Sequence, residues 1–181
     1  TEAITWSWQF LVDVLKLEKD RIYVSVFGGD GKILFDEDSY NIWLNLGIRK
    51  DHIFKYGKKE NFWGPVGLTG PCGPDNEMFF DTGSGPVPSG GPASDSERFV
   101  EIWNDVFMEY DKQSDGSFES LRQKNVDTGM GLERILAVLN DKKSIFETDL
   151  FVPIIETIKH LSSNFTERGA RIIADHIKSA V

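Results

Sequence analysis

Val126-Asp-Thr-Gly-Met-Gly-Leu-Glu-Arg134 is the most informative stretch of this chain, because a β-rich segment meets a helix in it. Gly129 and Gly131, at the expected strand-to-helix junction, allow a ligand to approach the backbone closely. The first helical turn offers N–H groups and the positive end of the helix dipole to an anion. Arg134 can stack on a base or bridge phosphate oxygens, and Asp127 can hold a cation such as an ammonium group.

A purely structural interpretation of the same residues needs no ligand. Asp127 would then cap the helix, and Arg134 would lie on its solvent-exposed face. The residues alone leave both interpretations open. Two common nucleotide sites are disfavoured, because no G-x-G-x-x-G follows a strand and no phosphate-binding G-x-x-x-x-G-K-[ST] is present.

Residues 98–110 form the second informative segment. Their β-branched and aromatic side chains predict a central strand that is covered on both faces. In strict alternation Asn104 and Val106 share one face of this strand, and Glu101 lies on the other. We therefore expect Asn104 and Val106 to face a pocket, whereas Glu101 could join Asn104 at a Mg²⁺ ion only if the strand bulges or twists between them.

A third segment, residues 57–74, is rich in glycine and proline and predicts a loop around Trp63. A large aromatic side chain in such a loop can form a rigid pocket wall, or it can anchor the loop in the core. The residues alone favour the anchor. Cys72 has no histidine or basic residue nearby in the sequence, which argues against a nucleophilic role.

The rest of the chain predicts an α+β fold with helices added to an antiparallel sheet. Apolar spacing predicts an amphipathic helix over residues 3–17, and Asp38 is the expected cap of a short helix through Leu46. The other expected elements are strands at 21–27, 77–81 and 118–121, an exposed loop at 83–95, a helix that opens within 125–134, and helices at about 148–161 and 166–180.

Composition narrows the class of protein. The chain has 181 residues, 40% of them apolar, and a net charge of −9. These values predict a soluble, cytoplasmic domain that neither spans a membrane nor coats nucleic acid, although a local basic patch for a polyanion stays compatible with them. One cysteine and three widely spaced histidines give no zinc site, and no G-x-S-x-G elbow points to a Ser-His-Asp triad.

Several linked motifs resemble the alanyl-tRNA synthetase family of class II aminoacyl-tRNA synthetases. The motifs are Asn61-Phe-Trp63, Thr69-Gly-Pro-Cys-Gly-Pro74, Glu101-Ile-Trp-Asn104, Val126-Asp-Thr-Gly-Met-Gly-Leu-Glu-Arg134 and Arg171-Ile-Ile-Ala-Asp-His-Ile177. They occur in the family's order and cover nearly the whole chain. Their combination makes the resemblance far more specific than any one motif does.

The resemblance implies a class II catalytic domain, an antiparallel sheet flanked by helices. Such a domain makes alanyl-adenylate from alanine and Mg·ATP and transfers alanine to the 3′ end of tRNA(Ala). By the same resemblance, Asp127 would bind the alanine ammonium group and Gly129 would bound the pocket. Trp63 and Val106 would surround the methyl group, and Asn104 would help to hold the amino acid.

The resemblance also implies an ATP site. Arg134 and Gly131 would contact ATP, and Glu101 would contact ATP and Mg²⁺. Arg134 and Asp127 would be the residues closest to the chemistry. No zinc is expected in this segment.

By resemblance, residues 1–143 would be the C-terminal portion of the aminoacylation domain, with class II motif 3 at 126–134. Residues 144–181 would begin the helical tRNA-recognition domain. Motifs 1 and 2 should precede Thr1, so we expect the chain alone to be inactive and able to self-associate. After Pro74 the sequence departs from the family pattern, which leaves the role of Glu77 open.

Two other functions remain as alternatives. The chain could be a non-catalytic binding module, derived from a synthetase or paralogous to one. It could also be an unrelated α+β interaction domain whose motif matches arose by chance.

Overall fold

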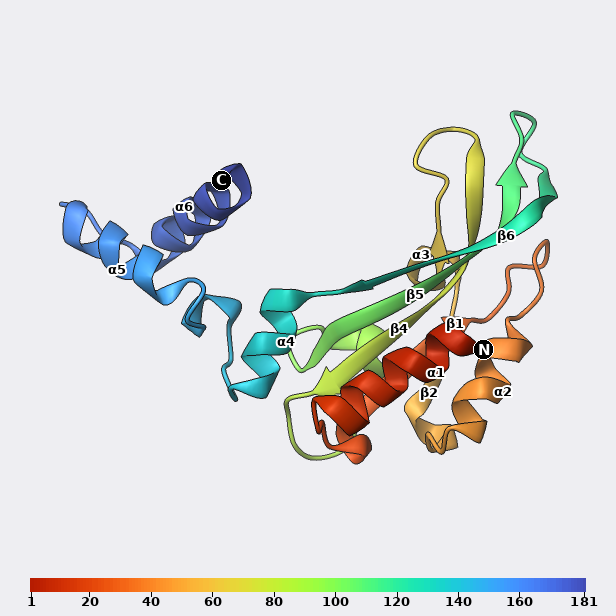
Figure 1. The fold of residues 1–181 in the computed structure, drawn as a ribbon, viewed down its shortest axis with the longest axis horizontal. Helices are drawn as coiled ribbons and strands as arrows, with labels where there is room; N and C mark the ends of the chain where they lie inside the picture. Colours follow the sequence, from red (N-terminus) through yellow and green to blue (C-terminus); the bar gives the residue numbers. More distant parts are fainter. The chain divides into compact units, whose positions relative to one another are not determined.

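The computed structural model describes all 181 residues and divides them into two compact units, residues 1–131 and 132–181. The first unit contains α1 (Glu2–Gln9), β1 (Ile22–Phe27), α2 (Glu37–Asn45), β2 (Ile53–Tyr56), α3 (Lys58–Asn61), β3 (Phe62–Trp63), β4 (Gly70–Asp81), β5 (Phe99–Lys112) and β6 (Phe118–Met130) (Figure 1). The second contains α4 (Leu132–Leu139), α5 (Val152–Leu161) and α6 (Glu167–Ala180). The domain boundary expected after residue 143 stays a prediction.

One sheet organises the first unit. Its strand order is β2-β1-β4-β5-β6, and β3 pairs with β4 beside this path. All pairings are antiparallel except that of β1 with β2, which are connected through α2. This arrangement confirms the predicted α+β class with an antiparallel sheet flanked by helices. The short β2 and its parallel pairing were not predicted.

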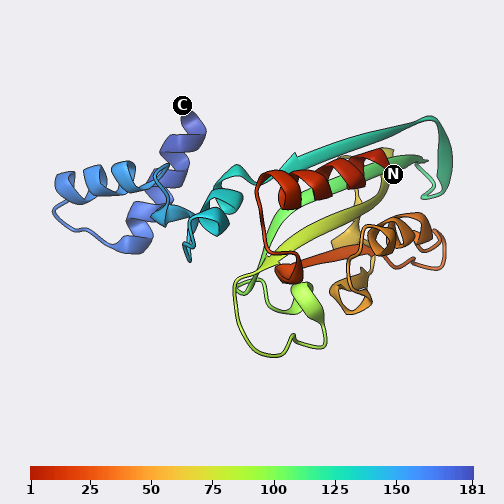
Figure 2. The same ribbon diagram turned by 60° about the horizontal axis from the view of Figure 1, so that its bottom comes forward.

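One face of the sheet packs against α1 and α2, and we call it the α1 face. Ile4, Trp8 and Leu11 are buried there, and Trp8 contacts Trp43 of α2 edge to face. Ser7 Oγ of α1 donates to Asp105 Oδ2 of β5 at 2.9 Å. Figure 2 shows the red α1 lying along the β5–β6 part of the sheet.

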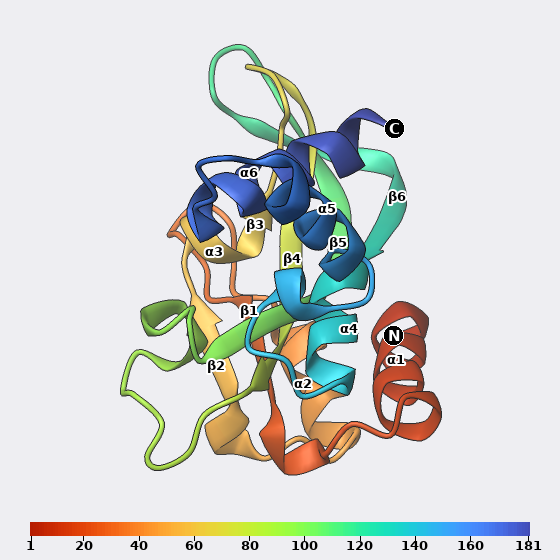
Figure 3. The same ribbon diagram turned by 90° about the vertical axis from the view of Figure 1, so that its left-hand side faces the viewer.

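The opposite face, which we call the α3 face, is covered in part by α3 and β3. Asn61 at the end of α3 donates to Ser25 Oγ of β1 at 2.9 Å. Phe62 packs into a buried cluster with Phe27, Ile33 and Cys72. Figure 3 shows α1 and α3 on opposite sides of the strands. The sheet is therefore covered on both faces around β4, as its apolar sequence requires.

The N-terminal helix differs from the prediction of a single helix over residues 3–17. The α-helix ends at Gln9 and continues as a π-helical segment, Phe10–Val14, in which Leu15 N–H donates to Phe10 O. Lys16 then takes a positive φ of 60°, which ends the helix. The predicted cap of the next helix is also wrong, because Asp36 Oδ1, and not Asp38, accepts from the backbone of Ser39 at 3.0 Å.

The predicted loop over residues 57–74 is wrong, since it contains α3, β3 and the start of β4. Proline and glycine are tolerated in β4 because its register with β5 shifts between Cys72 and Asp75. A Cβ atom on Gly73 would lie only 1.9 Å from Phe107 O, so this close approach requires glycine. The strands predicted at 77–81 and 118–121 are correspondingly longer, and β6 runs on to Met130.

The second unit consists of short helices with clear start signals. α5 has a proline in its first turn, and Thr166 Oγ1 caps α6 by accepting from Gly169 N–H at 3.2 Å. Glu133 of α4 and Lys178 of α6 form an ion pair. The two helices predicted at the end of the chain are confirmed within a few residues. None of the helices is both long and apolar enough to cross a membrane.

Candidate functional site

Four of the predicted substrate-binding residues occupy two adjacent rows on the α3 face. Val106 of β5 lies opposite Asp127 of β6, and Asn104 lies opposite Gly129. Opposed residues of an antiparallel pair point to the same face, and so do residues two apart along one strand. The sheet register therefore gathers residues from two separate sequence motifs on one surface.

The two rows continue onto β4. Asp75 lies opposite Val106, and Glu77 lies opposite Asn104. Along the first row Asp75 and Val106 are buried, with 7% and 3% of their surface exposed, whereas Asp127 on the edge strand is exposed. The row thus leads from a closed, partly apolar interior to an accessible carboxylate.

A β-bulge brings Glu101 to the same face, which strict alternation did not predict. Met78 is opposite Trp103, but the next residue, Phe79, is opposite Glu101, so Ile102 is the extra residue on β5. Because Phe79 lies two residues after Glu77 on β4, Glu101 shares the face of Asn104. The bulge that a shared Glu101–Asn104 site would need is present.

Gly129 leaves open space on this face. A Cβ atom built on it would have only one heavy atom within 4 Å, Asn104 Oδ1 at 3.6 Å, which is an ordinary contact distance. Neither packing nor a left-handed backbone therefore requires glycine here. A missing side chain that the fold does not need is what a ligand approaching the strand backbone would use.

Asp127 does not cap a helix, because it lies within β6 and α4 begins at Leu132. Its Oδ1 accepts from the backbone N–H of Thr128 at 3.0 Å. Its neighbour Thr128 points to the α1 face, where its Oγ1 donates to Asp105 Oδ1 at 2.6 Å. Asp105 is fully buried, and burial raises the pKa of its carboxyl group. The hydrogen bonds that join Ser7, Asp105 and Thr128 on the α1 face thus fix the segment that carries Asp127.

Trp63 lies on β3, opposite Gly73 of β4, and 36% of its surface is exposed. The residue that begins its motif, Asn61, is fully buried and donates from Nδ2 to the backbone O and to Oδ1 of Asp75, both at 3.2 Å. Burial raises the pKa of Asp75 to about 7, and the charge of Glu101 adds to this rise. Trp63 is therefore partly accessible while its strand is held from the interior.

Sequence reasoning assigned no role to Asp75, Asn61 or Ser25, although the structure joins them beside the two rows. The available signal was an aspartate placed directly after Pro74 in a segment whose other residues are mostly built for burial. Cys72 is buried, and burial raises the pKa of its thiol, which does not favour a nucleophilic thiolate.

Gly131 and Arg134 follow these rows along the chain. Gly131 N–H donates to Ile102 O at 3.2 Å, which extends the strand ladder by one residue. Arg134 lies in the first turn of α4, within the second unit. The Asp, Glu, His and Cys side chains form no group of three or more that could hold a metal ion.

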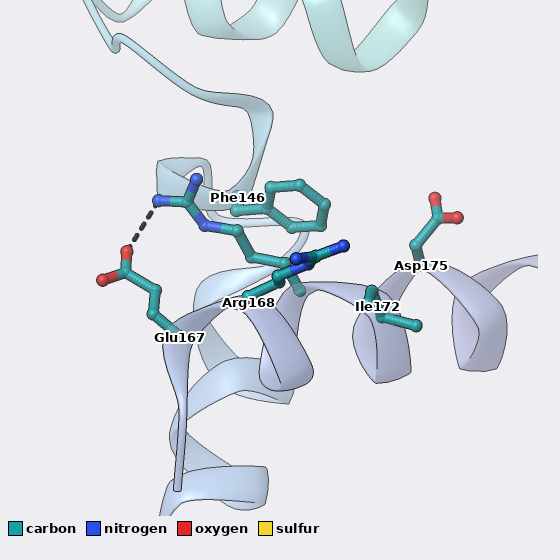
Figure 4. Close-up of a pocket in the computed structure, with 6 residues that line it drawn as sticks. Phe146, Glu167, Arg168, Ile172 and Asp175 are labelled. Carbon is teal, nitrogen blue, oxygen red and sulfur yellow. Dashed lines mark hydrogen bonds and ion pairs between the residues drawn. The ribbon is translucent and has the colours of Figure 1, made fainter.

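A separate open groove of about 610 Å³ lies within the second unit, beside α6 (Figure 4). Arg168, Ile172 and Phe146 contribute to its lining. Arg171 pairs with Glu167 at 2.6 Å and lies over the Phe146 ring, 5.5 Å from its centre. The carboxylates of Glu167 and Asp175 also line the groove. Its guanidinium groups and aromatic ring are side chains suited to phosphate or base contacts.

Comparison with known proteins gives consistent results. Residues 1–181 match the family described as tRNA synthetases class II (A). The chain is 45% identical over 187 residues to the alanine–tRNA ligase of Borrelia hermsii, covering 98% of this chain and 32% of that ligase. It is 46% identical over 188 residues to the alanine–tRNA ligase of Treponema pallidum, covering 99% of this chain and 31% of that protein. The chain thus spans about a third of the length of these relatives.

Proposed function

The chain belongs to the class II tRNA synthetase family, and from that premise we propose that it carries part of the site at which an alanine–tRNA ligase activates alanine. In the proposed reaction an alanine carboxylate oxygen forms a bond to the α-phosphorus of ATP. The bond from that phosphorus to the bridging oxygen of the β-phosphate breaks, and pyrophosphate leaves. The alanyl group of the adenylate then passes to a ribose hydroxyl at the 3′ end of tRNA(Ala), releasing AMP.

The observation that carries this proposal is the pair of rows on the α3 face. They place an accessible carboxylate, Asp127, next to a buried small apolar side chain, Val106. Beside these lie an amide, Asn104, and a position without a side chain, Gly129. A small zwitterion with a methyl side chain needs this combination: an acid for the ammonium group, an apolar wall, a hydrogen-bonding group and little space.

Each residue then has a distinct role toward alanine. Asp127 binds the ammonium group, a charge-assisted contact worth about 1.5–3 kcal/mol. Val106 and Trp63 limit the side chain to a methyl group, and Asn104 orients the amino acid. Such a pocket excludes large side chains by size but discriminates weakly against glycine and serine, because one methylene is worth about 1–3 kcal/mol and an added hydroxyl group is rejected only about a hundredfold.

ATP binding is proposed for Gly131 and Arg134, which follow the two rows along the chain, and for Glu101. Arg134 contacts ATP through its guanidinium group, and Gly131 allows close approach of the nucleotide to the backbone. Glu101 would hold Mg²⁺ together with phosphate oxygens and water, which fits an ion that usually takes only one or two protein carboxylates at nucleotide sites. Bound Mg²⁺ would neutralise charge on the phosphates. Asp127 and Arg134 are thus the residues proposed to lie nearest the reacting groups.

Residues 144–181 are proposed to begin the part that recognises tRNA, and residues 1–143 to belong to the aminoacylation domain. The groove beside α6 supports this assignment, since Arg168 and Arg171 could contact tRNA phosphates despite the net charge of −9. A cytoplasmic location follows from the proposed role in protein synthesis.

Alanine-dependent exchange of pyrophosphate into ATP tests the proposal. The protein should be expressed from its complete reading frame. Its rate of exchange with alanine is then compared with its rates with glycine, serine and valine. We expect exchange with alanine, weaker exchange with glycine and serine, and none with valine. A folded protein that binds an alanyl-adenylate analogue without any exchange would instead support the non-catalytic binding module.

A further inference from the structure

Asn61 is held in a buried position by a small set of polar contacts. Its Nδ2 donates to Ser25 Oγ at 2.9 Å, and to the backbone O and Oδ1 of Asp75 at 3.2 Å each. Its Oδ1 is buried without a hydrogen-bond partner. The amide of Asn61 therefore depends on Ser25 and Asp75 for its position.

Asn61 is also the last residue before the strand that carries Trp63. Phe62 and Trp63 form only two ladder positions with β4, opposite Pro74 and Gly73. A ladder this short gives little positional control, and Pro74 has no N–H to contribute to it. Directly before β3, the buried contacts of Asn61 with Asp75 connect this segment to β4 of the sheet.

Asp75 is connected to both proposed walls of the amino-acid pocket. Through Asn61 it reaches the segment of Trp63, and across the β4–β5 ladder it lies directly opposite Val106. Only 7% of its surface is exposed. Burying a carboxyl group costs stability, so packing alone gives no reason for an aspartate at this position.

We propose that Asp75 is a positioning residue of the alanine pocket: its carboxyl oxygen fixes Asn61, and through Asn61 it sets the distance between Trp63 and Val106. This inference rests on the proposed function of the pocket. Either protonation state of Asp75 leaves a carboxyl oxygen that can accept from Asn61 Nδ2. The position therefore needs an acceptor of this shape, which asparagine also provides.

A set of four variants tests the proposal. Asp75→Ala and Asn61→Ala each remove one partner, and Asp75→Asn keeps an acceptor at the same place. Asp81→Asn is the matched control, because Asp81 is also a buried aspartate of β4 but pairs with Arg98 at 2.6 Å instead. Each variant is expressed from the complete reading frame, because the chain alone is expected to be inactive. The Michaelis constants for alanine and ATP and the kcat of pyrophosphate exchange are then measured for each protein.

We expect Asp75→Ala and Asn61→Ala each to raise the alanine KM about tenfold, or about 1.4 kcal/mol. Kcat and the ATP KM should stay within about twofold. The double variant should be no worse than Asn61→Ala alone, because Asn61→Ala already removes the contact with the Asp75 carboxyl group. Asp75→Asn should keep the wild-type alanine KM. Asp81→Asn should also leave the alanine KM unchanged but should lower the stability of the fold.

Hydrogen–deuterium exchange of residues 58–66 separates this inference from the proposed function. We expect faster exchange there in Asp75→Ala and Asn61→Ala, and wild-type exchange in Asp75→Asn. A folded Asp75→Ala protein with unchanged exchange in this segment, or with an unchanged alanine KM, would overturn the positioning role. If the wild-type protein shows no alanine-dependent pyrophosphate exchange, the proposed function fails. The hydrogen–deuterium exchange data still decide whether Asp75 positions the Trp63 segment.

Discussion

A Cβ atom on Gly129 would lie 3.6 Å from Asn104 Oδ1, its partner across the β5–β6 ladder, with no other heavy atom within 4 Å. The folded chain therefore has room for alanine at position 129. Neither the backbone conformation nor the core constrains the identity of this residue, and the proposed function explains it by the space that bound alanine would need. This separation of stability from function makes Gly129 a favourable position for mutation.

Gly129→Ala should fold with a free energy of unfolding within about 0.5 kcal/mol of wild type, or slightly above it, because alanine restricts the unfolded chain. Its alanine KM should rise at least about tenfold, since the added methyl group takes up the space proposed for the substrate. Gly67→Ala is the matched control, because its Cβ would also make only an ordinary contact, with Thr69 O at 3.8 Å. Urea unfolding of both variants measures their stability, and pyrophosphate exchange measures their alanine KM. Equal alanine KM values for Gly129→Ala and Gly67→Ala would contradict the prediction.

Asp127→Asn should weaken alanine binding by about ten- to a hundredfold, because it replaces a charge-assisted contact to an ammonium group by a neutral one. ATP binding should change little. Stability should also be nearly unchanged, since Asp127 is exposed and its Oδ1 accepts from the backbone of Thr128, its neighbour in the chain. Calorimetric titration with alanine and with an ATP analogue measures the two affinities separately. A similar loss for both ligands would argue against the ammonium contact.

Much of the sheet could be predicted from the sequence, because β-branched and aromatic residues dominate its central strands. The first part of β4, before the strand predicted at 77–81, could not, since Pro71, Gly73 and Pro74 look like loop residues when local propensity is considered alone. Tertiary pairing overrides that propensity: β4 keeps its pairing across a register shift, and Gly73 packs on the backbone of Phe107.

The candidate site shows a similar division. Alternation correctly placed Asn104 and Val106 on one face, but the bulge at Ile102 that brings Glu101 there depends on the pairing of β4 with β5. Asp75 and Asn61 received no role in the sequence analysis, because the contact between them forms only when β3 folds onto β4. Sequence periodicity reports the face of a residue within a regular strand and does not report irregular pairing.

Arg168→Ala should lower tRNA charging without affecting alanine activation, if the groove beside α6 contacts tRNA. Losing one phosphate contact should raise the tRNA KM several-fold at low salt and reduce the salt dependence of binding by about one unit of the log–log slope. Lys159→Ala removes the same charge from α5, outside the residues that line the groove, and should have a smaller effect. Aminoacylation and pyrophosphate exchange, measured at two salt concentrations, distinguish these outcomes.

Asp75→Asn should make the protein more stable at pH 8 than wild type, and the difference should shrink as the pH falls toward 4. Burial raises the pKa of Asp75 from its ordinary 3.8 to about 7. Between these values the folded protein keeps a proton that the unfolded chain has released, so the wild-type free energy of unfolding falls as the pH rises through this window. Above pH 7 both states are ionised, and the full cost of burying the charge is present.

Asparagine carries no charge at any pH, so this cost disappears in the variant. At about 1.36 kcal/mol per pKa unit the gain at pH 8 is at most about 4 kcal/mol, and relaxation around the buried charge will lower it. The raised pKa of Asp105 also makes stability depend on pH, but it is common to both proteins and cancels in the difference. Urea unfolding at pH 5 and pH 8 measures that difference. A stability gain of the same size at both pH values would show that Asp75 is not the group that titrates, because an uncharged substitution that merely improved packing would act independently of pH.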